Sequence, residues 1–118
     1  MHFSLLLFAL SKILKVASFT NSKFKHYIRN ANVRGLIKTA DGKHARLFVF
    51  NKGTVSSRPG DHKDYDAALI WKDAATGFSV MTSKKPDASF NAAAEKKLWV
   101  RGVSFYAQWF EDAVNLVL

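Results

Sequence analysis

Apolar residues recur at helical spacing near the start of the chain. Between positions 3 and 17 an apolar side chain returns every three or four residues, which predicts an amphipathic helix. The stripe consists of Phe3, Leu6, Leu7, Leu10, Ile13, Leu14 and Ala17. A second, short helix is expected within residues 20–33, where Thr20 or Asn21 can serve as its N-cap.

The next part of the chain carries the pattern of strands. Runs of β-branched, aromatic and other apolar residues are separated by glycine, proline and polar turns, and Asp41-Gly42 is a strong signal for a short hairpin. The first three strands form a predicted meander, and a polar loop at 61–66 leads into the fourth. The predicted strands are residues 33–40, 44–52, 54–58, 67–72 and 97–101.

Apolar residues occupy both sides of the predicted sheet. In the second strand Leu47 and Val49 face one side, while Phe48 and Phe50 face the other. Sheets that are buried on both faces are usually covered by helices on both. We therefore expect the helices not to be confined to one layer.

Three more helices are expected in the second half of the chain. Asp73 can cap the first, in which Gly77 is a weak point, and Pro86 suits the first turn of the second. Ser104 can cap the terminal helix. Its apolar face covers about half of the circumference, wider than the ~100° stripe typical of a core-facing helix. That face consists of Phe105, Tyr106, Trp109, Phe110, Ala113, Leu116 and Val117.

The order of these elements predicts an α+β fold (a mixed α/β arrangement). A five-stranded, mainly antiparallel sheet is expected to be covered by helices, with the amphipathic helix as an N-terminal addition. A chain of 118 residues is long enough for one domain but not for two. Residues 1–32 should form helices that pack on the same domain as residues 33–118.

Positive charge is concentrated in the first half of the chain. Residues 1–60 hold eleven Lys and Arg against one acid, which gives +10, whereas residues 61–118 hold seven against eight, which gives −1. This asymmetry favours a polyanionic partner, either a nucleic acid or an anionic membrane surface. The absence of cysteine excludes disulfides and cysteine-based zinc sites, and it fits a reducing, cytoplasmic compartment.

The N-terminal helix does not have the features of a secretory signal. It lacks a basic first region and a small-residue cleavage site, and its uninterrupted apolar run over residues 3–10 is short. It also looks too short to span a bilayer, which takes ~20 apolar residues. Two alternatives remain, docking on its own domain or lying on a membrane surface. In the second case the helix governs delivery rather than folding, and the expected membrane contacts are Leu6, Leu10, Lys12, Lys15, Lys23, Lys25 and Arg29.

No residue pattern predicts catalysis, a cofactor or a metal site. The four histidines are scattered, and the loop with Asp61, His62, Asp64 and Asp66 is expected to be a solvated turn, because no glycine sits where a calcium loop needs one. Binding of nucleic acid is an alternative, because aromatic and basic residues alternate over residues 23–29. Helical spacing, however, places the apolar members of that segment on one face, which is more typical of burial.

The second half of the chain resembles the sterol carrier protein 2 domain family. That family has a strand reading D-A-x-I/L after its meander, matched here by Asp66-Ala67-Ala68-Leu69, and a final G-x-L-x-V/I-x-G strand, matched by Leu98, Val100 and Gly102. Two positions depart from the pattern: Lys96 stands where a glycine often opens that strand, and Val103 where an acidic residue follows it. The resemblance covers about residues 33–118.

The resemblance implies an apolar cavity for a fatty acyl chain, a sterol-like molecule or an isoprenoid quinone. Its walls would come from the helices at 73–83 and 86–96, the sheet and the last helix. The implied cavity residues are Phe78, Val80, Met81, Phe90, Phe105, Trp109, Phe110 and Ala113.

The function implied by the resemblance is that of a non-catalytic lipid carrier. It would be monomeric or dimeric and cytoplasmic, and it would work peripherally at the inner face of an anionic membrane. The alternatives are a basic nucleic-acid-binding module and a structural accessory subunit that serves a partner enzyme in a membrane-associated complex, such as one of ubiquinone synthesis, in which bacterial proteins of this family act.

Overall fold

The computed structural model describes residues 2–83 and 88–117, so Pro86 lies outside the described residues. Most of the predicted elements are present within a few residues of their expected bounds. The helices are α1 (His2–Thr20), α2 (Ser22–Ile28), α3 (Ala74–Met81), α4 (Ala88–Ala94) and α5 (Ser104–Asn115). The strands are β1 (Asn32–Thr39), β2 (Ala45–Asn51), β3 (Thr54–Pro59), β4 (Ala67–Trp71) and β5 (Leu98–Gly102).

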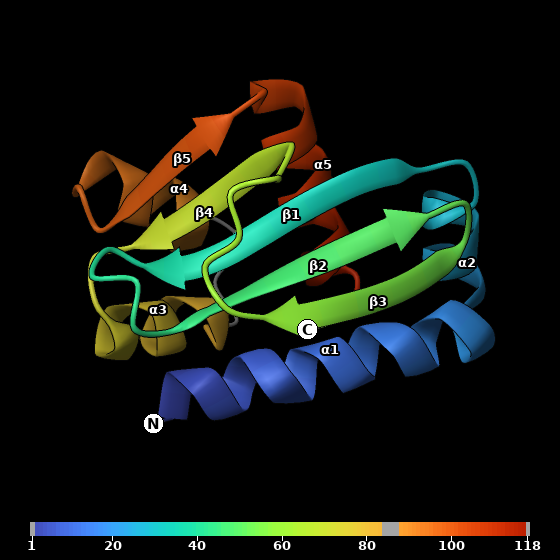
Figure 1. Cartoon of the computed structure of the whole chain (residues 1–118), viewed down its shortest axis with the longest axis horizontal. Helices are drawn as coiled ribbons and strands as arrows, with labels where there is room; N and C mark the ends of the chain where they lie inside the picture. Colours follow the sequence, from blue (N-terminus) through green and yellow to red (C-terminus); the bar gives the residue numbers. More distant parts are fainter. Residues whose placement is uncertain (1, 84–87, 118) are drawn as a thin grey trace.

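The strands form one sheet in the order β3-β2-β1-β4-β5 (Figure 1). Three of the pairings are antiparallel, and the central pairing of β1 with β4 is parallel. The parallel pair arises because the chain leaves the meander at β3 and crosses back to the free side of β1. The prediction of a five-stranded, mainly antiparallel sheet in an α+β fold is confirmed.

The helices cover only one face of the sheet, so the expectation of helices on both faces is wrong. The buried side chains of the helices share one core cluster with strand residues such as Phe48, Phe50 and Trp71. The opposite face holds a smaller cluster of Leu36, Leu47 and Ala68, which contains no helical residue among those described. This second face is hereafter called the helix-free face.

The loop of residues 60–66 takes the place of a second helical layer. It crosses the helix-free face between β3 and β4 (Figure 1), and Tyr65 packs against the small cluster there. Asp61 accepts a hydrogen bond from Lys38 Nζ at 2.8 Å, and Asp64 pairs with Arg34 at 3.0 Å. The acidic side chains of this loop therefore bind strand cations, and the described part of the chain has no cluster of metal-ligating residues.

Two of the three proposed helix caps are confirmed. The side chain of Asn21 accepts a hydrogen bond from the amide of Phe24 at 3.1 Å, and that of Asp73 accepts one from the amide of Thr76 at 2.7 Å. The same bond from the Thr76 amide is the main reason why the pKa of Asp73 lies below its usual value. The expected cap at Ser104 is wrong, because α5 starts one residue earlier and Val103 occupies the N-cap position without a side-chain bond.

Helix α5 is seated on the sheet through a close contact with β1. Phe110 is completely buried and lies against Phe48 and Phe50, with ring centroids 5.9 Å apart in both pairs. A Cβ at Gly35 would come within 2.5 Å of the Phe110 ring. The missing side chain at Gly35 therefore makes the space that Phe110 fills.

We predict that Gly35→Ala lowers the free energy of unfolding by about 1–3 kcal/mol, the usual cost of overpacking a filled core. Urea unfolding followed by circular dichroism measures the change. Phe110→Leu should lose less stability in the Gly35→Ala background than in the wild type, because the smaller side chain relieves the clash. Additive losses in the double mutant would show that the two residues do not share this contact.

Candidate functional site

The broad apolar face of α5 divides between the sheet and helix α2. Phe110 and Ala113 are completely buried on the sheet. Trp109 is half-buried and stacks on Tyr27 of α2 with ring centroids 5.1 Å apart, while its edge meets Phe50 at 5.0 Å. The part of the face that carries Trp109 thus serves a helix–helix contact, whereas Phe105 and Leu116 are exposed.

The contact between α2 and α5 also fixes the aromatic residues of the basic segment. The hydroxyl of Tyr27 donates a hydrogen bond to the carbonyl of Trp109 at 3.0 Å. The pKa of Tyr27 is raised, mainly by burial and to a lesser extent by the charge of Asp112, so the hydroxyl keeps its proton. Phe24 and Ile28 are completely buried. The aromatic side chains of α2 are therefore engaged within the protein and do not form a stacking platform for bases.

Helix α3 lies very close to the sheet because of Gly77. A Cβ at this position would come within 2.7 Å of the Phe3 ring and 2.9 Å of the Trp71 ring. The residue that weakens the helix in isolation is thus the one that lets it approach β4. Because α3 has only eight residues, the tertiary contact rather than helix propensity must hold it in place.

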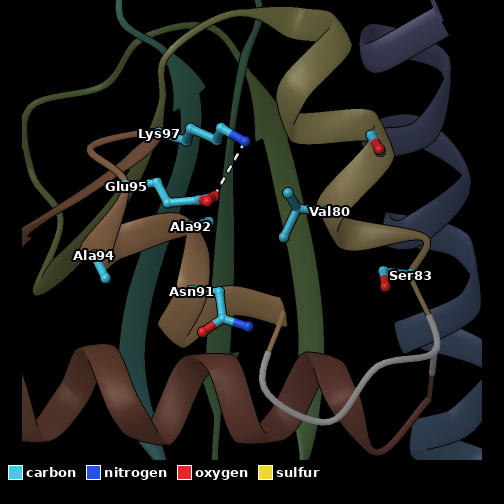
Figure 2. A pocket seen from close by; sticks show the side chains of 8 residues that line it. Val80, Ser83, Asn91, Ala92, Ala94, Glu95 and Lys97 are labelled. Atoms are coloured by element: carbon cyan, nitrogen blue, oxygen red, sulfur yellow. Dashed lines mark ion pairs between the residues drawn. The ribbon is translucent and has the colours of Figure 1, made fainter.

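A pocket of about 390 Å³ lies between α3 and α4, on the helix-covered side of the sheet (Figure 2). Its size falls within the range of small-molecule sites in proteins. Small and apolar side chains alternate in it with polar ones. The pocket is lined by Ser79, Val80, Ser83, Asn91, Ala92, Ala94, Glu95 and Lys97.

The charged groups of the pocket come from the turn between α4 and β5. Lys97 Nζ pairs with Glu95 at 3.1 Å, and both side chains are about half exposed (Figure 2). Asn91 lies on α4, four residues before Glu95, and Ser79 and Ser83 add hydroxyl groups from the α3 side. The pocket therefore offers an ammonium group, a carboxylate and an amide around a wall formed by Val80 and Ala92.

The core beneath the helices contains an unsatisfied hydrogen-bond donor. Within the described residues, the indole Nε1 of Trp71 is buried and has no partner. Trp71 belongs to the same core cluster as Ala92, and Val80 packs against that cluster. A buried donor without a partner costs about 1–3 kcal/mol, so an acceptor that reached it would be favoured.

The residues predicted to wall one cavity are not brought together around a single one. Val80 lines the pocket between α3 and α4, whereas Phe105 and Trp109 line a separate pocket with Tyr27, next to α2. Met81 packs against the core, Phe78 is partly exposed, and Phe110 and Ala113 are core. The side chain of Phe90 lies outside the described residues.

The sequence did not single out the polar residues of the pocket. Asn91, Glu95 and Lys97 stand in a run of alanine and lysine that reads as an ordinary solvated helix end. Only the return of the chain from α4 into β5 brings Lys97 back beside Glu95. The available signals were Val80 and the two helices at 73–83 and 86–96, which were expected to wall the cavity.

The predicted membrane residues divide between the core and the surface. Leu10 is completely buried and Leu6 half-buried, because the predicted stripe of α1 packs on the sheet. The cations expected at the membrane are exposed. They are Lys12, Lys15, Lys23, Lys25 and Arg29. The expectation that α1 serves delivery rather than folding therefore does not hold for its inner face, which supplies Phe3, Leu7, Leu10 and Leu14 to the core.

Solved structures share this arrangement of helices and strands. The UbiJ-SCP2 ubiquinone synthesis protein superposes with a TM-score of 0.70 at 15% identity, covering 96% of this chain and 91% of that one. Sterol carrier protein domain 2 of Helicoverpa armigera superposes with a TM-score of 0.67 at 14% identity, covering 94% of this chain and 87% of that one. A crystal structure of sterol carrier protein 2 gives 0.66 at 12% identity, over 92% and 93% of the two chains. The chain has the sterol carrier protein 2 fold. No protein-family model matches the sequence, and no curated protein sequence matches it.

Both departures from the sterol carrier protein 2 pattern occupy positions with a defined backbone role. Lys96 has a φ of +61°, in the left-handed region that favours glycine. Val103 is the N-cap of α5, where an acidic side chain would accept a hydrogen bond from the first turn. The glycine and the acid of the family pattern therefore fit this backbone better than the residues that this chain carries.

We predict that Lys96→Gly and Val103→Asp each raise the free energy of unfolding by about 1 kcal/mol. The first change relieves left-handed strain, and the second gives α5 a cap. Thermal unfolding of each variant measures the gain, with Lys96→Ala as the control that keeps the strain. A loss of stability in either family-like variant would contradict this interpretation of the two positions.

Proposed function

We propose that this protein is a non-catalytic lipid carrier whose ligand enters between α3 and α4. The observation that carries the proposal is the pocket between these helices, in a sterol carrier protein 2 fold, above a core that contains the unpaired Trp71 donor. Structures with the same fold include sterol carrier protein 2 and the UbiJ-SCP2 ubiquinone synthesis protein.

Helix α4 is the part of the helical layer that can yield to a ligand. Its described side chains are small, and only Ala92 among them is buried. In contrast, α1 and α5 each place several large side chains in the core. Among the described side chains, those of α4 therefore contribute less apolar contact than those of either longer helix.

The chemistry of the pocket favours a single apolar chain with a small polar head. A carboxylate head can replace Glu95 as the partner of Lys97, and a hydroxyl or a carbonyl can bind Asn91. The chain itself would lie along Val80 and Ala92 toward Trp71. A fatty acid or an isoprenoid tail meets these requirements.

Enlarging Val80 should obstruct this site. We predict that Val80→Phe raises the dissociation constant for a fluorescent fatty acid at least about tenfold, a difference of 1.4 kcal/mol. Titration of cis-parinaric acid measures it, and both proteins are first shown to be fully folded. Val100→Phe is the matched control, because it adds the same atoms on exposed β5, away from the pocket.

The wild type must also bind the fatty acid saturably. No saturable signal at tens of micromolar would contradict the proposal, as would equal affinities of the wild type and Val80→Phe.

The outer face of α1 is the surface that we propose lies on a membrane. Leu5 is 66% exposed and Phe19 is 72% exposed, and Phe8 and Val16 continue the stripe between them. Val16 and Ile13 also line a groove shared with Leu116 and Val117. This stripe differs from the one expected from the sequence, which faces the core.

Helix α1 is longer than its uninterrupted apolar run suggested. Residues Phe3–Thr20 are long and apolar enough to cross a membrane by length and composition, with a mean hydropathy of 1.6, so the expectation that the segment is too short is wrong. Core helices of soluble proteins and signal sequences can have the same length and hydropathy, and 39% of this segment is buried inside the protein. We propose a peripheral contact, because leaving the sheet would expose the core.

Exposed lysines strengthen the proposed membrane contact. Lys12 and Lys15 project from α1, and Lys23, Lys25 and Arg29 follow on α2. A lysine or arginine beside an anionic leaflet contributes about 1 kcal/mol. The stripe and the cations together favour the anionic inner face of a membrane, which would place the carrier in the cytoplasm.

Replacing the outer stripe should abolish membrane binding without unfolding the protein. We predict that Phe8→Gln with Phe19→Gln reduces co-sedimentation with phosphatidylserine-containing vesicles at least about tenfold, whereas the midpoint of thermal unfolding stays within a few degrees. Phe105→Gln is the control, because Phe105 is as exposed as Phe19, at 72%, but lies on α5. Equal loss with Phe105→Gln, or no loss with the double variant, would contradict a specific role of α1.

A structural accessory subunit is the second candidate function. The overlap with the UbiJ-SCP2 ubiquinone synthesis protein, at a TM-score of 0.70, is the observation that favours it. Such a subunit would present quinone intermediates, or only a surface, to a partner enzyme. If the protein binds neither the fatty acid nor a short-chain quinone but still binds vesicles, this function would be favoured over that of a carrier.

A further inference from the structure

The helix-free face carries a second groove, remote from the pocket between α3 and α4. It has a volume of about 710 Å³ and is lined by residues of the loop 60–66 and of strand β5. Ala68 and Ile70 of β4 form its floor, and Tyr65 and Trp99 line it on either side. Because β4 contributes alternate residues to the two faces, the sheet itself separates this groove from the helix-covered core.

The loop leaves this end of the helix-free face uncovered. Leu36 and Leu47 are completely buried, whereas Trp99 is 45% exposed. The cross-strand neighbour of Trp99 is Ile70, so the indole and the apolar floor form one continuous surface. A planar apolar group can lie on this surface.

The polar part of the groove is positively charged. Lys38, Lys63 and Arg101 line it together with one carboxylate, Asp61, so its net charge is three minus one, or +2. Lys38 Nζ lies 2.8 Å and Lys63 Nζ 3.7 Å from Asp61. The bond from Lys38 is the main reason why the pKa of Asp61 is lowered, so this carboxylate stays ionised and holds both ammonium groups at the groove.

Arg101 supplies an unpaired cation beside the indole. Among the described residues no carboxylate lies within ion-pair distance of its guanidinium. Arg101 is exposed and lies two residues after Trp99, so both side chains project from the same face of β5. Guanidinium groups bind carboxylates and phosphates in a bidentate manner.

We propose that this groove binds a small planar aromatic anion, with its ring on Trp99 and its carboxylate or phosphate between Arg101 and Lys63. The site is independent of lipid binding, because it shares no residue with the pocket between α3 and α4. A purely apolar ligand would make no ion pair with the cations of the groove, and an aliphatic anion would not stack on the indole of Trp99. A planar aromatic anion can do both.

The proposal is tested with 2-naphthyl phosphate on the full chain. Its binding is followed by ¹⁵N–¹H NMR spectroscopy, in which the indole signal of Trp99 is assigned by its loss in Trp99→Leu. Saturable shifts should appear at the Trp99 indole and at the amides of Ala68 and Ile70. Neutral 2-naphthol and non-planar cyclohexyl phosphate should each bind at least about tenfold more weakly.

Variants distinguish this site from the lipid pocket. Arg101→Gln should weaken 2-naphthyl phosphate at least about tenfold and bring it to the level of 2-naphthol, whereas Val80→Phe should leave it unchanged. Shifts confined to α3 and α4, or equal binding of 2-naphthol and its phosphate, would overturn the proposal. Tight binding of an oligonucleotide together with failure of the small anion would overturn it in favour of a nucleic-acid surface.

Discussion

The architecture depends on the close approach of α5 to the sheet at Gly35. Phe110 occupies the space that a side chain at Gly35 would fill, and it touches Phe48 and Phe50 of the neighbouring strand. This contact fixes the height of α5 above the sheet, and thereby the position from which Trp109 reaches Tyr27 on α2. Gly77 has the same role for α3, which lies against Trp71 and Phe3. Two missing side chains thus set the spacing of α5 and α3 above the sheet.

Sequence reasoning recovered the strands, the caps at Asn21 and Asp73, and the family resemblance, because these features depend on local patterns and short-range chemistry. It failed where the outcome depends on what a distant segment covers. The apolar residues on both sides of β2 predicted two helical layers, but the small cluster around Leu47 is covered instead by the loop that carries Tyr65. The same limit applies to α1. Its spacing identified the inner stripe, with Leu10, but not that the sheet rather than a membrane covers that stripe, nor that Phe19 belongs to an exposed outer stripe.

The candidate site shows a similar division. The helices that border the pocket were expected to wall a cavity, and the pocket does lie between them. The aromatic residues of α5 were assigned to the same cavity because a broad apolar face suggested surplus surface. Part of that surplus is used in the contact between Trp109 and Tyr27, which brings together residues 82 positions apart in the chain, whereas Phe105 is exposed. A pairing of that kind has no signal in a single sequence.

The molecule therefore has surfaces of different chemical character: an apolar and basic outer side on α1 and α2, a small pocket in the helical layer, and a cationic groove on the helix-free face. The proposed carrier function rests on the pocket. The most direct test is an NMR measurement of intermolecular nuclear Overhauser effects between ¹³C-labelled palmitate and the methyl groups of the protein. We expect contacts from the palmitate chain to the methyl groups of Val80 and Ala92. Contacts only to Val16 and Val117 beside α1, or no intermolecular contacts at saturating palmitate, would contradict the carrier function proposed for this pocket.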